Sequence, residues 1–318
     1  HSLTRSPSVS ILPPNWTASA KLWAPECPKP VTDMADPDNT ISFQGVLGAY
    51  SNMACREVYP DMEPLPSAAF EDAFEAVTSG RARYAMIPID NSVAGRVADI
   101  HHLLPGSGLY IIAEHFLRVN HQLLAVPGTD IDEITHVHSH VHALNQCRNL
   151  IRELGVQPVV HADTAGAAHD IAEAGDKTQA AISSELAGEM YGLASLRGDV
   201  EDATHNTTRF VVMAREAAPP PSETPNLITT FTFRVRNVPG SLYKVMGGFA
   251  TNGVNMTKLE SYVDEDFVAA QFYADVEGHP DQTSLKLALE ELDFFTDAVH
   301  VLGTYPAHPF RQRRNGTK

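Results

Sequence analysis

Between positions 41 and 214, short apolar runs alternate with segments of helical spacing. A continuous apolar run such as YAMIPI at residues 84–89 is typical of a buried strand. On the same criterion we predict strands at residues 41–43, 84–89, 109–112, 122–126, 134–137, 156–160, 180–183 and 210–214. We predict helices at 51–58 (capped by Ser51), 70–78, 143–154 (closed by Gly155), 165–174 (closed by Gly175) and from Ser184 onward. Such alternation predicts an α/β fold with mostly parallel pairing.

After a Pro-rich linker at residues 216–226, the pattern of apolar and polar positions changes. We predict strands at 228–235, 254–263, 267–276 and 298–303, and helices at 241–251 and 281–292. The turn Asp264-Glu265-Asp266 separates the middle two strands. This βαββαβ order predicts a second domain of the ferredoxin-like type at residues 227–304, with a polar and basic tail at 305–318 that we expect to be disordered.

The first 40 residues contain seven of the 22 prolines and lack a periodic apolar pattern. We therefore expect residues 1–40 to be a disordered extension or an added, non-native segment. Met34 is a plausible native start, and we expect the first domain to span residues 41–215.

Composition excludes several classes of protein. The 23 basic and 39 acidic residues give a net charge of -16, which argues against nucleic acid and anionic membranes as partners. The three cysteines form no CxxC pair, so we expect neither a disulfide framework nor a thiolate metal site. No apolar run reaches the ~20 residues of a membrane-spanning helix. A cytoplasmic protein fits these features.

Two patterns suggest ligand sites but are weak. Gly45-Val46-Leu47-Gly48 follows a strand, yet its spacing is not that of a dinucleotide-binding loop, and an anion-binding turn and a plain tight turn stay open. His136, His138, His140 and His142 alternate like ligands on one strand face. We predict a strand-to-helix corner near Ser139 that breaks this alternation, and we expect no bound metal.

Polar residues at the ends of strands are better candidates. Asn91 and Ser92 end a buried strand, where open α/β sheets bind ligands, although turn chemistry alone also explains them. Ser139 at a helix start can hold a carboxylate, with Gln146 projecting from the first turns of that helix. Simple capping is the alternative for Ser139 and for Thr164.

The segment Asn206-Thr207-Thr208-Arg209-Phe210 places amide, hydroxyl and guanidinium groups just before the last strand of the large domain. An arginine fork suits a carboxylate. Alone, the segment also reads as the polar entry of a strand.

Taken in order, the motifs resemble those of the prephenate dehydratase family. The matching stretches are FQGVLGAYSN at 43–52, PIDNSVAG at 88–95, SHVHALNQC at 139–147, DTAGAA at 163–168, AAISSELAGEMYGL at 180–193 and NTTRFVVMAR at 206–215. Residues 227–303 resemble the ACT regulatory domain, through NVPGSLYKVM at 237–246 and KLESYV at 258–263. The resemblance implies a catalytic domain of two lobes, like a periplasmic binding protein, followed by the ferredoxin-like domain.

The resemblance also implies roles for individual residues. Thr208 corresponds to the catalytic threonine of the family. The implied substrate-binding residues are Asn91, Ser92, Ser139, Gln146, Thr164, Arg209 and Phe210, and the implied effector-binding residues are Asn237, Pro239, Gly240, Ser241, Leu242, Glu260 and Ser261. Two departures stand out: Asp90-Asn91 replaces the frequent Glu-Asn, and Tyr262-Val263 replaces Arg-Pro after Glu260-Ser261. The second departure puts effector affinity in question.

The implied reaction converts prephenate to phenylpyruvate in L-phenylalanine biosynthesis. Aromatisation drives it, so we expect no cofactor. L-phenylalanine is the implied inhibitor, and the implied assembly is a homodimer or homotetramer. The alternatives are arogenate dehydratase and a non-catalytic amino-acid sensor.

Overall fold

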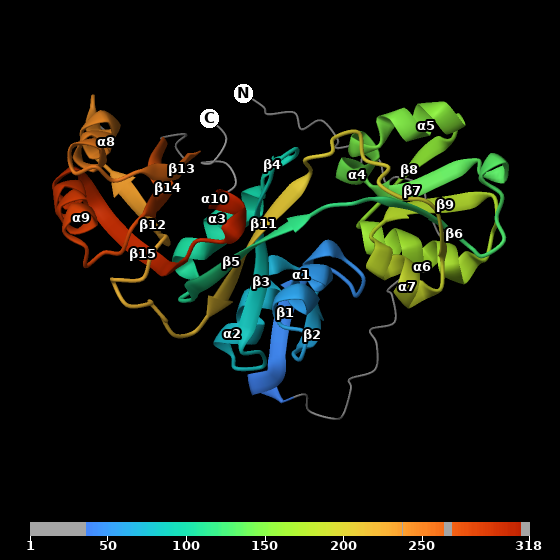
Figure 1. Cartoon of the computed structure of the whole chain (residues 1–318), viewed down its shortest axis with the longest axis horizontal. Helices are drawn as coiled ribbons and strands as arrows, with labels where there is room; N and C mark the ends of the chain where they lie inside the picture. Colours follow the sequence, from blue (N-terminus) through green and yellow to red (C-terminus); the bar gives the residue numbers. More distant parts are fainter. Residues whose placement is uncertain (1–35, 237, 264–268, 313–318) are drawn as a thin grey trace, which may run out of the picture. The chain divides into compact units, whose positions relative to one another are not determined.

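The computed structural model describes residues 36–236, 238–263 and 269–312 (Figure 1). This part of the chain forms three sheets, two in the large domain and one in the C-terminal domain. Our expectations for Asn237, for the turn at 264–266 and for residues 1–35 concern positions outside the described residues.

The first sheet has the order β2-β1-β3-β11-β5, with β4 paired to β3. Its strands are β1 (Thr40–Gln44), β2 (Glu63–Ser67), β3 (Tyr84–Asn91), β4 (Gly95–Arg96), β5 (Tyr110–Arg118) and β11 (Thr207–Ala214). With it come α1 (Tyr50–Val58), α2 (Phe70–Thr78), α3 (Ala98–Leu103) and the 3-10 turns η1 (Pro37–Asn39) and η2 (Leu104–Gly106). β1, β2 and β3 are parallel, whereas β11 runs antiparallel to both β3 and β5.

The second sheet has the order β10-β6-β9-β7-β8. Its strands are β6 (Gln122–Ala125), β7 (His136–His140), β8 (Gln157–His161), β9 (Gln179–Ser183) and β10 (Ala194–Arg197). Its helices are η3 (Ile131–Glu133), α4 (Val141–Gln146), α5 (Arg148–Leu154), α6 (Thr164–Ala174) and α7 (Glu185–Tyr191). The chain enters this lobe after β5 and returns to the first lobe at β11 (Figure 1). The large domain is therefore an α/β fold of two lobes joined by two crossing segments.

Several details differ from the expectation. Parallel pairing does not dominate, because β11, β6 and β10 pair antiparallel with their neighbours. The helix predicted over 143–154 is two helices separated at Cys147, because the Asp202 carboxylate accepts from the backbone N–H groups of Arg148 and Asn149 and starts α5. Ser51 lies inside α1, whose N-cap is Ala49. The strands β2, β4 and β10 and the helix α3 were not predicted.

The C-terminal sheet has the order β13-β14-β12-β15, all antiparallel. Its elements are β12 (Leu227–Val235), α8 (Ser241–Thr251), β13 (Met256–Val263), β14 (Ala269–Glu277), α9 (Thr283–Phe295) and β15 (Thr296–Pro306). This is the predicted βαββαβ arrangement. The prediction of a disordered tail is wrong for its first part, because residues Pro309–Gln312 form α10 and Arg311 pairs with Glu114 of β5.

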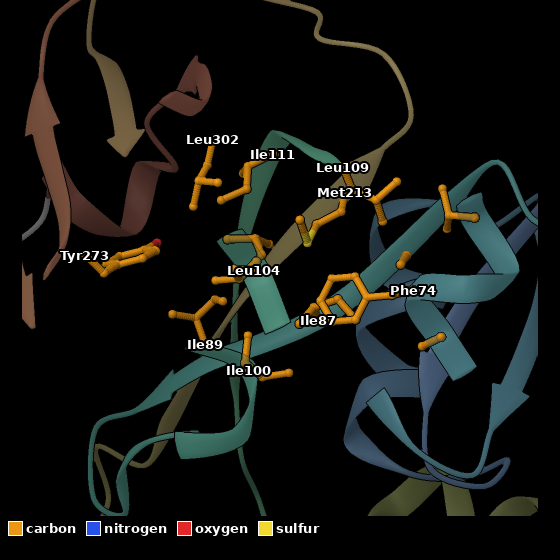
Figure 2. Close-up of a cluster of buried hydrophobic side chains, with 14 of the residues drawn as sticks. Phe74, Ile87, Ile89, Ile100, Leu104, Leu109, Ile111, Met213, Tyr273 and Leu302 are labelled. Carbon is orange, nitrogen blue, oxygen red and sulfur yellow. The ribbon is translucent and has the colours of Figure 1, made fainter. Parts of the chain in front are cut away.

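One apolar cluster joins the large domain to the C-terminal sheet. It combines Ile87, Ile111 and Met213 with Tyr273 and Leu302 (Figure 2). Gly303 makes this approach possible, since a Cβ at that position would lie 1.9 Å from the carbonyl oxygen of Ile111. The contact thus requires a residue without a side chain on β15.

No helix of the described residues has the length and apolar character needed to cross a membrane. Cys55 and Cys147 are buried free thiols.

Candidate active site

Thr208 and Asn91 face each other across paired strands at the point where the chain crosses between lobes. They are in register on β11 and β3, and the Asn91 Nδ2 donates to Thr208 Oγ1 over 2.9 Å. The Asn91 Oδ1 accepts from the backbone N–H groups of Val93 and Ala94, at 2.9 and 2.7 Å. These two backbone donors fix which end of the Asn91 amide faces Thr208. Thr208 therefore accepts through its oxygen and keeps its own hydrogen for another acceptor.

Asn206 and Gln146 continue the network into the second lobe. Asn91 Nδ2 also donates to Asn206 Oδ1 over 2.8 Å, and Asn206 Nδ2 donates to Gln146 Oε1 over 2.9 Å. Gln146 is the last residue of the six-residue helix α4 and so lies within its first two turns, as predicted. The structure thus brings three predicted site residues together through a fourth, Asn206, which belongs to the motif without having been assigned a role.

Two further members of the network were missed. His121 Nε2 lies 2.9 Å from Gln146 Oε1, and Tyr50 Oη lies 2.8 Å from His121 Nδ1. Burial lowers the pKa of His121, with the hydrogen bond to Gln146 and the Glu201 carboxylate acting in the opposite direction. Burial raises the pKa of Tyr50, because it disfavours the charged phenolate. A lone histidine and a lone tyrosine carry no spacing signal, and only the fold shows that they meet.

The other predicted substrate residues differ in their hydrogen-bond partners and in their position within the strands and helices. Ser92 lies next to Asn91, donates to the His205 carbonyl over 2.7 Å and accepts from the Thr207 N–H over 3.0 Å. Ser139 is fully buried within β7 and donates to the Ile182 carbonyl over 2.6 Å, so it is not at the strand-to-helix corner, which comes after His140. Thr164 is the first residue of α6, whose N-cap is Asp163.

Arg209 belongs to a buried group of charges. Its guanidinium donates to Glu114 over 2.9 Å, to Asp275 over 2.6 Å and to the Tyr305 hydroxyl over 3.0 Å. Arg311 donates to the same two carboxylates. All these partners are protein groups, and two belong to the C-terminal sheet. Such bonds hold the strand that carries Thr208.

Phe210 is 1% exposed and lies in the apolar cluster formed with β1 and α1. In this position its ring packs in the core beneath the site and supports β11.

The glycine turn at residues 45–48 is held by contacts within the protein. Gly45 N–H donates to the Ser67 carbonyl, Gly48 N–H donates to Asn52, and a Cβ on Gly48 would lie 3.0 Å from Ala187 of the second lobe. These contacts support the tight-turn alternative.

β7 extends through His140, so His136, His138 and His140 share a face, while His142 lies in α4. Among the described residues, the group with metal-ligand spacing is a different one: His169, Asp170 and Glu173.

A hollow of about 1490 Å³ lies between the large domain and the C-terminal sheet. Asn91 and Ser92 line one part of it, and Lys258, Asp275 and Arg311 line another.

Of the predicted effector residues, Gly240 caps α8 with φ +80°, and Ser241 and Leu242 open that helix. Glu260 and Ser261 lie on the edge strand β13, where Glu260 is 3.3 Å from Lys258. Pro239 precedes the cap.

Comparisons with known proteins identify related sequences and structures. The family model "Prephenate dehydratase" matches residues 41–218. A protein of Komagataeibacter europaeus named bifunctional N-acyl-homoserine lactone acylase/prephenate dehydratase is 51% identical over 277 residues, which is 87% of this chain and 99% of that protein. Arogenate dehydratase/prephenate dehydratase 1 of Arabidopsis thaliana is 36% identical, over 88% of this chain and 76% of the relative.

A solved structure of prephenate dehydratase in complex with L-Phe, from Arthrobacter aurescens, is 30% identical with a TM-score of 0.78, over 84% of this chain and 90% of that one. The similarity therefore extends over both the large domain and the C-terminal sheet.

Proposed function

We propose that this chain, which belongs to the prephenate dehydratase family and is a prephenate dehydratase, uses Thr208 as its catalytic hydrogen-bond donor. The observation that carries this assignment is the Asn91 Nδ2 bond to Thr208 Oγ1, which leaves the threonine hydrogen directed elsewhere. Among the described residues, no acceptor for that hydrogen is within bonding distance. A departing hydroxide can take this place.

The main task of the enzyme in this reaction is to stabilise the charge that develops on the leaving group. In prephenate, the bond between the ring and its carboxylate breaks, and its electron pair forms a ring double bond as the ring C–O bond breaks. The hydroxide takes one proton, so the products are CO2, water and phenylpyruvate. A threonine hydroxyl is a weak acid, and it acts by stabilising the charge that develops on the leaving oxygen.

The polar groups around Thr208 provide for the rest of the substrate. Asn91, Ser92 and Gln146 lie at the crossing of the lobes, and Thr164 lies at the start of α6, where the Asp163 carboxylate accepts from the Gly166 N–H. Ser139, Arg209 and Phe210 act on this site by holding the strands on which it is built.

The test is a pair of substitutions. Thr208→Ala should lower turnover by roughly 10²–10⁴-fold, the contribution of a positioned proton donor, with folding retained. Thr207→Ala should have a much smaller effect, because its hydroxyl donates to the His205 carbonyl. Turnover near wild type in Thr208→Ala, or equal damage in both variants, contradicts the assignment.

Arogenate, the amino-acid analogue, is the alternative substrate, and the name of the Arabidopsis relative includes both activities. Product analysis separates them, since prephenate gives phenylpyruvate and arogenate gives phenylalanine. We expect phenylpyruvate to form with the higher kcat/KM.

L-phenylalanine is the proposed effector, and the C-terminal domain is its proposed site. In support, the α8 N-terminus offers N–H groups to a carboxylate, and the edge strand β13 carries Glu260. The name of the Arthrobacter structure includes bound L-Phe. If the site is separate from the substrate site, raising prephenate will not relieve inhibition. Purely competitive inhibition contradicts a separate site.

Pairing of two or four copies is part of this proposal. Tyr243 and Phe294 on α8 and α9 are 81% and 76% exposed, which provides apolar surface for a partner copy. Sedimentation of the full chain should give a dimer or tetramer, and a monomer at micromolar concentration contradicts this. The two free buried thiols are compatible with the proposed cytoplasmic location, which cell fractionation tests.

A second candidate activity follows from the Komagataeibacter relative, whose name includes N-acyl-homoserine lactone acylase and which matches over nearly its whole length. The assay is release of homoserine lactone from an N-acyl substrate by the purified chain, with Thr208→Ala beside it. No release above the uncatalysed rate removes this candidate.

A further inference from the structure

We propose that His121 is a positioning residue that fixes the Gln146 carboxamide so that its two N–H bonds face the substrate. The inference rests on the proposed function of the Thr208 site. His121 follows β5 in one of the two segments that cross between lobes, and it is 2% exposed. It is therefore placed to act on a residue of the second lobe without reaching the substrate itself.

The orientation of each amide in the network follows from two backbone groups. The N–H groups of Val93 and Ala94 can only donate, so the atom of Asn91 that faces them is the oxygen. The Asn91 nitrogen must then face the oxygen of Asn206. In turn, the nitrogen of Asn206 must face the oxygen of Gln146.

This order determines the state of His121. Because Gln146 presents its oxygen, His121 Nε2, at 2.9 Å, must carry a hydrogen and donate it. In the neutral ring Nδ1 is then an acceptor 2.8 Å from Tyr50 Oη, whose single hydrogen is shared between this nitrogen and the Asn120 carbonyl at 2.9 Å. The His121 backbone N–H donates to Glu201 over 2.9 Å. Ring and backbone of His121 are thus both held.

Gln146 Oε1 is saturated, because it accepts two hydrogen bonds, one from each of the two crossing segments. Among the described residues, no side chain or backbone group accepts from its amide nitrogen, which can therefore donate to a substrate carboxylate or carbonyl. Without His121 the carboxamide loses half of what holds it and can rotate. Replacing His121 should therefore weaken mainly substrate binding, because Asn91 orients Thr208 independently of His121.

The experiment compares two replacements of the same ring. Glutamine carries its nitrogen three bonds from Cβ, as Nε2 of histidine is, whereas asparagine carries it two bonds away, as Nδ1 is. His121→Asn should raise KM for prephenate about tenfold, the size of one lost hydrogen bond, with kcat changed much less. His121→Gln should restore KM to within about threefold of wild type, and Tyr50→Phe should raise KM by a few-fold.

Thermal unfolding and circular dichroism of each variant establish that it is folded. Equal impairment of His121→Gln and His121→Asn overturns the proposal, because the imidazole then acts through packing alone. Unchanged KM in His121→Asn overturns it as well. Wild type and Thr208→Ala are assayed in parallel: full activity in Thr208→Ala defeats the proposed function, while the His121 pair tests only the positioning.

Discussion

At the scale of single residues, neighbouring hydrogen-bonding groups set the orientation of the Thr208 hydroxyl, and its acidity is that of any threonine. Thr208 has an ordinary hydroxyl, and in the proposed function its hydrogen is available to the leaving group because Asn91 donates to its oxygen. Asn91 in turn is held by two backbone N–H groups of the following turn. A local turn motif thus sets the orientation of the proposed catalytic group.

Asn91→Asp tests the direction of the Thr208 hydrogen. It keeps the shape and the bonds from Val93 and Ala94, but it replaces the donor that faces Thr208 and Asn206 by an acceptor. Thr208 then gives its hydrogen to the new carboxylate, and kcat should fall about 10²- to 10³-fold, the loss of one donor aimed at a developing negative charge. Steady-state kinetics at neutral pH measure this. A kcat within twofold of wild type would mean that the Asn91 donor does not set the direction of the threonine hydrogen.

At the scale of elements, the sequence contains the signals of some boundaries and not of others. The helices that end at Gly155, Gly175 and Gly192 have these glycines in the left-handed conformation, and Ser184 caps α7 through its side chain. Such signals are local. By contrast, the start of α5 depends on Asp202, far along the chain, and the edge strand β2 (EPLPS) has two prolines and little apolar character.

The residues of the candidate site also divide into those with a local sequence signal and those without one. Thr208, Asn91 and Gln146 were found through their motifs, and the structure joins them by hydrogen bonds through Asn206. His121 has no pattern around it. Arg209 was expected near a carboxylate, and the carboxylates it meets are Glu114 and Asp275 of the protein. Sequence patterns cannot show that Asp275 of β14 comes within 2.6 Å of Arg209 of β11, since the two strands belong to different domains.

The buried charges make the Asp275 contact measurable. Asp275 is fully buried, and Asp275→Asn leaves part of the Arg209 charge without a partner, which should cost about 3 kcal/mol of unfolding free energy. The control is Asp297→Asn, which removes an exposed ion pair with Arg236 and should cost less than about 1 kcal/mol. Denaturant unfolding at pH 7 measures both. Equal small losses would mean that Arg209 needs no partner in the C-terminal domain.

The same pair has a defined pH dependence. Burial acts to raise the pKa of Asp275, but Arg209, Arg311 and the bond from Thr230 outweigh it, so the pKa is lowered. A lowered pKa stabilises the folded state above the ordinary value of about 3.9 and loses this stabilisation as the pH falls through the folded pKa. The difference in stability between wild type and Asp275→Asn should therefore shrink below about pH 4.

At the scale of the whole described chain, the C-terminal sheet contacts both residues that neighbour the Asn91–Thr208 pair. Arg209 follows Thr208 and pairs with Asp275, while Asp90 precedes Asn91 and lies 2.6 Å from the Lys258 ammonium. Ion pairs thus connect β13 and β14 to the residues on either side of the Asn91–Thr208 hydrogen bond. An effector in the C-terminal domain can regulate only if it favours one such arrangement over another.

Lys258 offers the gentler test of this route, because it is partly exposed and its loss leaves no buried charge unpaired. Lys258→Gln should leave kcat within about threefold, since Asp90 still lies 3.9 Å from Arg209. It should raise the L-phenylalanine concentration for half-inhibition by about fivefold or more, the lower end of typical coupling between sites. The control is Arg197→Gln, which removes a 2.9 Å contact to Glu153 at an exposed position of the second lobe and should change inhibition little. Inhibition curves of the three proteins at one prephenate concentration decide the matter. If Lys258→Gln and wild type are inhibited alike, the signal does not pass through the Asp90–Lys258 pair, and the ion pair of Asp275 with Arg209 is the other connection between the C-terminal domain and Thr208 to be tested.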